Sequence, residues 1–260
     1  MHASIQRAVA ELTTGEDAQR HFDLAAERIQ HALLEVSLPD VDGLEVGVHA
    51  EPARLVGGDY IDLFAPVERS LVFGLGDASG KSLAAALNAL MLRYLVRGLV
   101  SAIGREDLQS VVTHTNNVVT EDLSDGAFIT FLLGSIDAST GALRVVNAGH
   151  EPPLILRANS LAVETMDMHD IVLGIDNDTN YVQQEVHLCV GDAAMFYTDG
   201  LTEATNARGE LYTIERLKEA FIEHRALPAQ ALADEMFVRI RKYSAAALRD
   251  DATILVFRRT

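Results

Sequence analysis

The sequence predicts an α+β domain in which antiparallel sheets carry helices on their outer faces. Strand-like runs mostly follow one another around short turns, whereas a parallel sheet would need a helix after each strand. Long apolar-rich segments with helical spacing occur at residues 81–101 and 108–121. The 260 residues are 48% hydrophobic and 23% charged, which suits one large globular domain or a domain with a short appendage.

The first 40 residues predict a helical linker or regulatory segment. Within residues 16–36, apolar side chains recur at helical spacing, at Phe22, Ala25, Ile29, Leu33 and Val36. Pro39 and Gly43 then break the helix, so we place a boundary at about residue 40. No sensor domain fits into this length. The apolar stripe predicts either a dimer contact or docking of an activating partner, or simply packing on its own domain.

Two pairs of strand-like runs predict hairpins. Residues 59–64 and 71–77 are separated by the turn 65–70, and residues 128–137 and 142–149 flank the Gly-containing turn ASTG. Further strands are expected at 44–50 and 251–257 and on either side of Gly191–Asp192, at 182–190 and 193–200. Further helices are expected at 214–224 and 229–244.

Composition excludes several partners and locations. The net charge of −17 repels the nucleic-acid backbone, so we expect no nucleic-acid partner. The single cysteine, Cys189, allows no internal disulfide and suits a reducing cytoplasm. We expect no membrane span, because the longest apolar stretch, 84–103, is interrupted by Asn88, Arg93 and Arg97. The N-terminus also lacks the pattern of a signal peptide.

The stretch GLGDASGKS, residues 74–82, resembles a phosphate-binding P-loop at first sight. The P-loop signature needs a glycine five positions before Gly80, and that position holds Leu75. Asp77 would also place a negative charge in a loop that works by aiming backbone N–H groups at an anion. Nucleotide binding through Lys81 therefore remains only a weak alternative, which ATP titration would test.

Acidic residues at strand ends offer a better interpretation of this loop. If residues 65–70 form the turn, antiparallel pairing places Asp59 nearly opposite Gly76–Asp77. Like charges that face each other in this way are destabilising unless a cation, a proton or solvent offsets them. Asp199 ends another strand-like run, and Asp250 and Asp251 immediately precede the last one. Carboxylates without Cys or clustered His select hard cations such as Mg²⁺ or Mn²⁺. Asp beside Gly as a plain turn former is the competing interpretation.

Five motifs in order resemble the metal-dependent protein phosphatases (type 2C, PPM), and specifically the bacterial SpoIIE/RsbU-like branch. They are PARLVGGDYIDLF, GLGDASGKSLAAAL, FITFLLGSIDASTGALRVVNAGHEPPLIL, MFYTDGLTEATNARGELY and RDDATILVF. The resemblance covers residues from about 26 to 260. It implies a four-layer α/β/β/α sandwich of two antiparallel sheets flanked by helices, with a phosphatase domain at 41–260 after the N-terminal linker helix.

The resemblance also implies a site for two Mn²⁺ or Mg²⁺ ions. Carried over by motif, the ligands are Asp59, Asp77, the backbone carbonyl of Ala78, Asp199 and Asp250, with Asp251 as a less favoured alternative to Asp250. All these acidic positions are present, which argues against a catalytically inactive relative.

Three further residues near these motifs have competing interpretations. Arg54 would neutralise the substrate phosphate, with a plain surface arginine as the alternative. Asp62 would support the metal site or be a solvated strand residue. His150 suggests a general acid, but we expect it to shape a turn by hydrogen bonding.

The implied activity is hydrolysis of phosphoserine or phosphothreonine by a metal-bridging water, in bacterial signalling. The usual substrate in this branch is a phosphorylated STAS-domain anti-sigma factor antagonist. No protein nucleophile is required, which suits a site made of carboxylates. The alternative is a phosphatase-like, non-catalytic interaction module controlled through its N-terminal helix.

Overall fold

The structure is a computed structural model. It describes residue 34 and residues 36–53, 57–80, 83–123, 126–160, 162–167, 170–244 and 248–260. Almost all of the predicted N-terminal helix, and Arg54, lie outside the described residues. The linker and its boundary near residue 40 therefore stay predictions.

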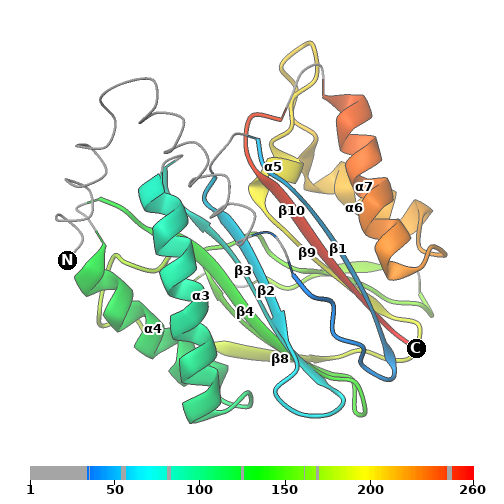
Figure 1. Ribbon diagram of the computed structural model, residues 1–260. Helices are drawn as coiled ribbons and strands as arrows, with labels where there is room; N and C mark the ends of the chain where they lie inside the picture. Colours follow the sequence, from blue (N-terminus) through cyan, green and yellow to red (C-terminus); the bar gives the residue numbers. More distant parts are fainter. Residues whose placement is uncertain are drawn as a thin grey trace.

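Two five-stranded antiparallel sheets face each other (Figure 1). The first sheet has the order β1 (Leu44–Glu51), β10 (Ala252–Arg259), β9 (Ala193–Tyr197), β6 (Leu154–Leu156) and β7 (Val163–Thr165). The second has the order β2 (Asp59–Phe64), β3 (Ser70–Ala78), β4 (Ile129–Asp137), β5 (Ala142–Ala148) and β8 (Gln183–His187). Every pairing between these strands is antiparallel, as the clustering of strand-like runs predicts.

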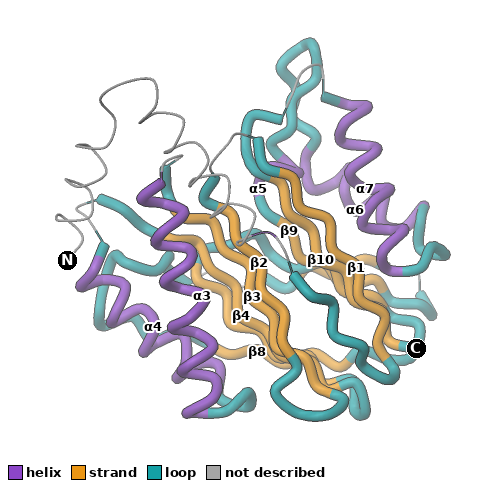
Figure 2. Tube along the Cα trace, in the orientation of Figure 1, coloured by secondary structure: helices purple, strands orange, loops and turns teal. Residues whose placement is uncertain are grey.

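Helices cover the outer face of each sheet and complete four layers (Figure 2). The helices α3 (Leu83–Ile103) and α4 (Leu108–Asp122) lie on the β2–β8 sheet, and α6 (Thr213–Glu223) and α7 (Ala229–Tyr243) lie on the other. A short helix, α5 (Asp199–Thr202), follows β9. The predicted α/β/β/α sandwich is confirmed.

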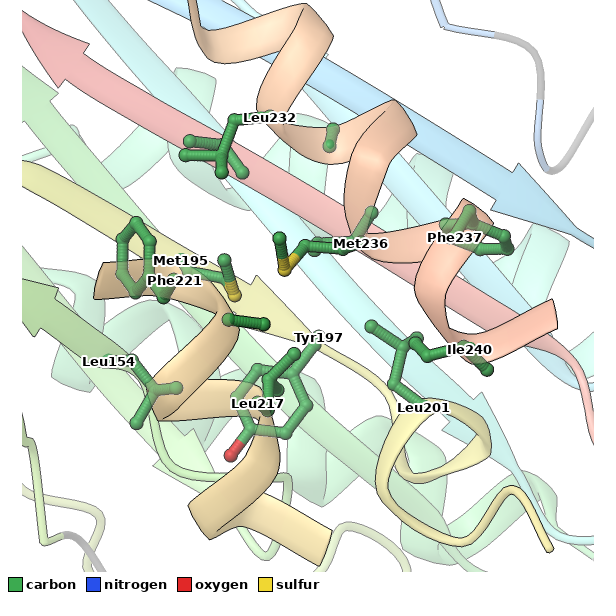
Figure 3. Close-up of a cluster of buried hydrophobic side chains, with 14 of the residues drawn as sticks. Leu154, Met195, Tyr197, Leu201, Leu217, Phe221, Leu232, Met236, Phe237 and Ile240 are labelled. Carbon is green, nitrogen blue, oxygen red and sulfur yellow. The ribbon is translucent and has the colours of Figure 1, made fainter. Parts of the chain in front are cut away.

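Three apolar clusters hold the layers together. One lies between α3, α4 and their sheet, one between α6, α7 and theirs (Figure 3), and one between the two sheets. In the cluster between the sheets, the ring of Phe73 lies 4.6 Å from that of Phe196 and 4.8 Å from that of Phe257, centroid to centroid. Each fully buried aromatic side chain of this kind contributes about 1.5–3 kcal/mol. This central layer fixes the two sheets against each other.

The strands β8 and β9 lie on either side of Gly191–Asp192, as expected. The turn does occur, and Gly191 there has a φ of +89°. However, β8 pairs with β5 and β9 pairs with β10 and β6, so the two strands belong to different sheets. The three-residue strands β6 and β7 and the four-residue helix α5 were not predicted, because such short elements carry no periodic signal.

One helix of the described chain, α3, is long and apolar enough to cross a membrane by length and composition alone. Asn88, Arg93 and Arg97 therefore do not exclude a span by composition, and the expectation of no membrane span stays a prediction. Its buried face packs on the second sheet through Ala85, Ala89, Leu92 and Val96. Core helices pass the same test, so this is weak evidence for a membrane span.

Candidate metal centre

The predicted pairing of two carboxylates is confirmed. Asp59, the first residue of β2, lies directly opposite Asp77, near the end of β3. Residues in register across an antiparallel pair project from the same face of the sheet, with Cβ atoms about 5 Å apart. Both carboxylates therefore belong to the same end of the sandwich.

The carboxylate of Asp59 is almost completely buried and is held by the opposite sheet. Thr198 and Thr253 each donate a hydroxyl hydrogen bond to its Oδ2 atom, both at 2.8 Å. Burial, followed by the charges of Asp77 and Asp251, raises the pKa of Asp59 well above 3.8, although the two hydroxyls act in the other direction. Buried carboxylates that repel one another are an arrangement that a bound cation stabilises.

Glycines leave room for oxygen atoms around Asp77. A Cβ atom on Gly58 would lie 2.3 Å from the carbonyl oxygen of Ala78 and 2.6 Å from Oδ1 of Asp77. The amide of Ala78 donates to the carbonyl of Gly58 at 3.1 Å, which fixes the two strand ends. Only glycine fits at position 58 without displacing two of the predicted ligands, because contacts below 3.0 Å force a shift.

The carboxylate of Asp251 contacts backbone amides before and at the start of β2. Its Oδ1 accepts from the amide of Ala53 at 2.8 Å, and its Oδ2 lies 3.5 Å from the amide of Asp59. A Cβ atom on Gly57 would overlap Oδ2 of Asp251 at 1.4 Å. Asp250 accepts the backbone N–H of Asp251 at 3.0 Å. Ala53, Gly57 and Asp59 thus all lie against the Asp251 carboxylate.

Asp199 is the first residue of α5, directly after Thr198. Gly200 follows it, where a Cβ atom would lie 2.0 Å from the carbonyl oxygen of Asp251, so α5 can approach β10 only with glycine there. The negative charges of Asp199 and Glu203, after burial itself, raise the pKa of Glu151. Glu151 is an acidic neighbour of the site that the sequence analysis missed.

His150 occupies a turn, as expected. Its backbone N–H donates to Oδ1 of Asn147 at 2.7 Å, and Asn147 donates back to the carbonyl of His150 at 3.0 Å. Its ring Nδ1 lies 2.9 Å from the hydroxyl of Thr130. Burial lowers the pKa of His150 to about 4, so the ring is neutral at neutral pH. A neutral, buried ring does not suit a general acid.

Asp62 is not part of this site, and both sequence interpretations of it are wrong. It is only 4% exposed, and Arg97 of α3 holds its two oxygens with hydrogen bonds of 2.7 Å each. Asp62 and Asp59 are three positions apart on one strand, so they project from opposite faces. Asp62 joins β2 to the helix layer.

The two threonines of the site were also missed, although both lie inside motifs quoted from the sequence. Thr198 precedes Asp199 in YTDG, and Thr253 follows Asp251 in DDAT. Their place in these two motifs was the only sign in the sequence that they belong to the site. Their shared contact with Asp59 depends on how the two sheets meet, which the motifs do not state.

The donor set suits a hard cation. It consists of carboxylates and a carbonyl, and Gly58 provides space beside them. Within the ranges that the structure describes, no three His, Cys, Asp or Glu side chains form a ready-made metal cluster. The structure thus pairs Asp59 with Asp77 and places Thr198 against Asp59, while the assignment of Asp199 and Asp250 as ligands stays a prediction.

Comparison with known proteins gives the family. A family model described as Stage II sporulation protein E (SpoIIE) matches residues 68–260. The chain belongs to the SpoIIE family. The resemblance stated from the five motifs is thus confirmed, and the SpoIIE match includes Asp77, Asp199 and Asp250, whereas Asp59 lies before it.

Individual relatives agree with this SpoIIE assignment. The chain is 28% identical to the phosphoserine phosphatase RsbU of Bacillus subtilis over 244 residues, which is 94% of this chain and 71% of RsbU. The predicted class of enzyme is therefore that of a relative aligned along nearly the whole chain.

Solved structures share the fold. The RsbU and RsbW domains of Rv1364c from Mycobacterium tuberculosis are 25% identical, with a TM-score of 0.75 over 88% of this chain and 63% of that one. The SiaA-PP2C domain of Pseudomonas aeruginosa matches with a TM-score of 0.74 at 21% identity over the full length of both chains. The catalytic domain of the phosphatase PstP, solved with two manganese ions, has a TM-score of 0.61 at 15% identity, covering 83% of this chain and 97% of that one.

Proposed function

We propose that this SpoIIE-family chain is a protein serine/threonine phosphatase that depends on two Mn²⁺ or Mg²⁺ ions. The observation that carries the proposal is the direct pairing of Asp59 with Asp77, with Asp59 buried and held by two hydroxyls. Isolated like charges in this position would destabilise the sheet edge, so a function that uses them explains their presence. The relationship to RsbU, a phosphoserine phosphatase, supports the same activity.

The proposed metal ligands are the carboxylates of Asp59, Asp77, Asp199 and Asp250 and the carbonyl of Ala78. Divalent ions bound there would supply an activated water and offset charge on the phosphoryl oxygens. Asp251 holds the loop before β2 through the amides of Ala53 and Asp59, so we assign it to positioning rather than ligation. Arg54, which lies outside the described residues, stays a candidate for the substrate phosphate.

The finer parts of the proposal concern the substrate and its setting. We assign a phosphorylated STAS-domain anti-sigma factor antagonist as substrate, and partner-switching signalling in the cytoplasm as the setting. The motif resemblance and the match to the RsbU domain of Rv1364c support this assignment. Residues 1–40 are proposed to dimerise or to bind an activating partner.

A phosphatase assay tests the proposal. The full chain is incubated with a serine-phosphorylated STAS-domain protein in the presence of either millimolar Mn²⁺ or EDTA. The released phosphate is then measured. We expect turnover only with the metal, and a loss of about 10²-fold or more in Asp77→Asn. The matched control is Asp178→Asn, which neutralises an exposed loop carboxylate and should keep full activity.

Two results would overturn parts of the proposal. Activity that survives both EDTA and Asp77→Asn would remove the metal mechanism. Tight Mn²⁺ binding without turnover on any phosphoprotein would instead favour the non-catalytic interaction module.

A further inference from the structure

The contact between Asp59 and the two threonines joins the two sheets at the proposed metal centre. Asp59 belongs to β2, whereas Thr198 follows β9 and Thr253 lies on β10. The threonines lie 139 and 194 residues from Asp59 along the chain, and both are fully buried. Two hydroxyls from one sheet thus converge on one oxygen of a carboxylate from the other.

The backbone fixes the direction of these hydroxyl groups. The amide of Thr253 donates to Oγ1 of Thr198 at 2.9 Å, and the amide of Thr198 donates to the carbonyl of Thr253 at 3.0 Å. Because Oγ1 of Thr198 already accepts this bond, its own proton points to Asp59. The β-branched side chain of threonine further restricts χ1. The two donors are therefore set in place before any ligand binds.

Both hydroxyls donate to the same atom, Oδ2, and among the described residues no hydrogen bond reaches Oδ1. A carboxylate held through one oxygen cannot rotate freely about its terminal torsion. Hydrogen bonds to an ionised acceptor are about twice as strong as neutral ones, so two of them hold the group firmly. The asymmetry leaves Oδ1 as the oxygen with which Asp59 can ligate a cation.

We propose that Thr198 and Thr253 are positioning residues that turn Asp59 into a preset one-oxygen ligand and thereby set the affinity of the centre for divalent cations. The inference rests on the proposed function for the metal centre itself. It goes beyond it by assigning two residues that touch neither the cation nor the substrate. Groups that orient a ligand typically change metal affinity 10–100-fold when removed.

A purely structural role, in which the threonines only tie the sheets together, makes a different prediction. Thr→Val keeps the shape of the side chain and removes the hydroxyl, whereas Thr→Ser keeps the hydroxyl. Thr115→Val is the matched control, because Thr115 is equally buried and its hydroxyl donates at 2.8 Å to the carbonyl of Val111, away from the centre. Thr253→Val and Thr115→Val each lose one buried hydrogen bond, and Thr198→Val loses two, because its hydroxyl also accepts from the amide of Thr253. All three variants are therefore expected to lose stability, so stability alone does not separate the two roles.

The experiment measures Mn²⁺ binding by calorimetry on the full chain without substrate, together with urea unfolding in EDTA. We expect Thr253→Val and Thr198→Val each to weaken Mn²⁺ binding about 10–100-fold, and each serine variant to restore it to within about threefold. We expect Thr115→Val to bind Mn²⁺ as the wild type does while losing stability. Where one valine variant does not fold, the other provides the test, because each threonine supplies one of the two bonds.

The outcomes distinguish this inference from the proposed function. Folded valine variants that bind Mn²⁺ with wild-type affinity would overturn the inference, as would serine variants that fail to restore binding. A wild type that binds no Mn²⁺ would overturn both the inference and the metal centre. A wild type that binds Mn²⁺, loses affinity in the valine variants and dephosphorylates nothing would sustain the inference and end the phosphatase proposal.

Discussion

Asp59 and Asp77 occupy directly opposed positions on β2 and β3, so two carboxylates face each other at one end of the sheet. Directly opposed like charges destabilise a strand pair by up to about 1 kcal/mol. In EDTA, Asp77→Asn should therefore raise the free energy of unfolding by a few tenths to about 1 kcal/mol, as urea denaturation would show. Mn²⁺ should stabilise the wild type and not the variant. A variant that is less stable than the wild type in EDTA would contradict this account.

Gly58→Ala should damage the site through space rather than charge. The added methyl group would meet the carbonyl of Ala78 at 2.3 Å and Oδ1 of Asp77 at 2.6 Å, so both oxygens must move. We expect a loss of about 1–3 kcal/mol in stability and a loss of Mn²⁺ affinity, measured by unfolding and calorimetry. Gly98→Ala is the control. It adds a methyl group on α3 with nothing within 4 Å, and should stabilise by up to about 1 kcal/mol.

His150 should make folding stability depend on pH. Its pKa is about 4 in the folded chain and near 6.5 when unfolded, so between these values the unfolded chain binds more protons. Stability from this group is therefore full above about pH 6.5 and is lost as the pH falls towards 4, by about 3 kcal/mol in all. Urea unfolding between pH 4 and 7 should show this slope in the wild type and not in His150→Gln.

Asp59 contributes with the opposite sign and must be separated from His150. Because its folded pKa is raised, its contribution to stability is present below about pH 3.8 and is lost as the pH rises through the folded pKa. The difference between wild type and His150→Gln at each pH isolates the histidine. Imidazole NMR provides a direct check, since a His150 ring that protonates near pH 6.5 would exclude the buried, neutral state.

The ion pair between Asp62 and Arg97 should matter more than an exposed pair of similar geometry. Arg97→Met leaves the buried Asp62 carboxylate without its two-pronged partner, although the Arg97 side chain is 44% exposed and solvent screens part of the effect. We expect a cost of about 1–2 kcal/mol in urea unfolding. Arg208→Met, which breaks the exposed pair with Glu210, should cost less than about 0.5 kcal/mol. Equal effects of the two substitutions would contradict this account.

Local patterns were enough to predict most of the fold and part of the site. Counting residues across the predicted turn placed Asp59 opposite Gly76–Asp77, and the observed partner is Asp77. By contrast, the turn at Gly191 looks the same whether its strands pair with each other or enter different sheets, so turn chemistry could not place β8 and β9. Strand alternation could have excluded Asp62 from the metal site. Residues an odd number of positions apart on a strand project from opposite faces, and Asp62 lies three positions after Asp59.

The contacts that could not be predicted are those made across the sandwich. Spacing does not reveal that Thr253 meets Asp59, because the meeting depends on the packing of the aromatic layer between the sheets. The same is true of Asp251, whose carboxylate accepts hydrogen bonds from the amides of residues nearly 200 positions earlier in the chain. The motif resemblance identified the segments that carry the candidate site, whereas the hydrogen-bond partners of each side chain could be found only in the structure.

The long separation between Asp59 and Thr253 also bears on how this chain folds. Contacts between distant residues form slowly, because the intervening loop must close first. β10 lies between β1 and β9 and carries Thr253, so until β10 has been synthesised β1 is not joined to this sheet and Asp59 lacks its second hydroxyl. A cation that binds only the finished centre stabilises it by mass action, about 2.7 kcal/mol at a hundredfold excess over its Kd. If the proposed centre binds Mn²⁺ or Mg²⁺, the cation would thus stabilise the folded chain as well as support its activity.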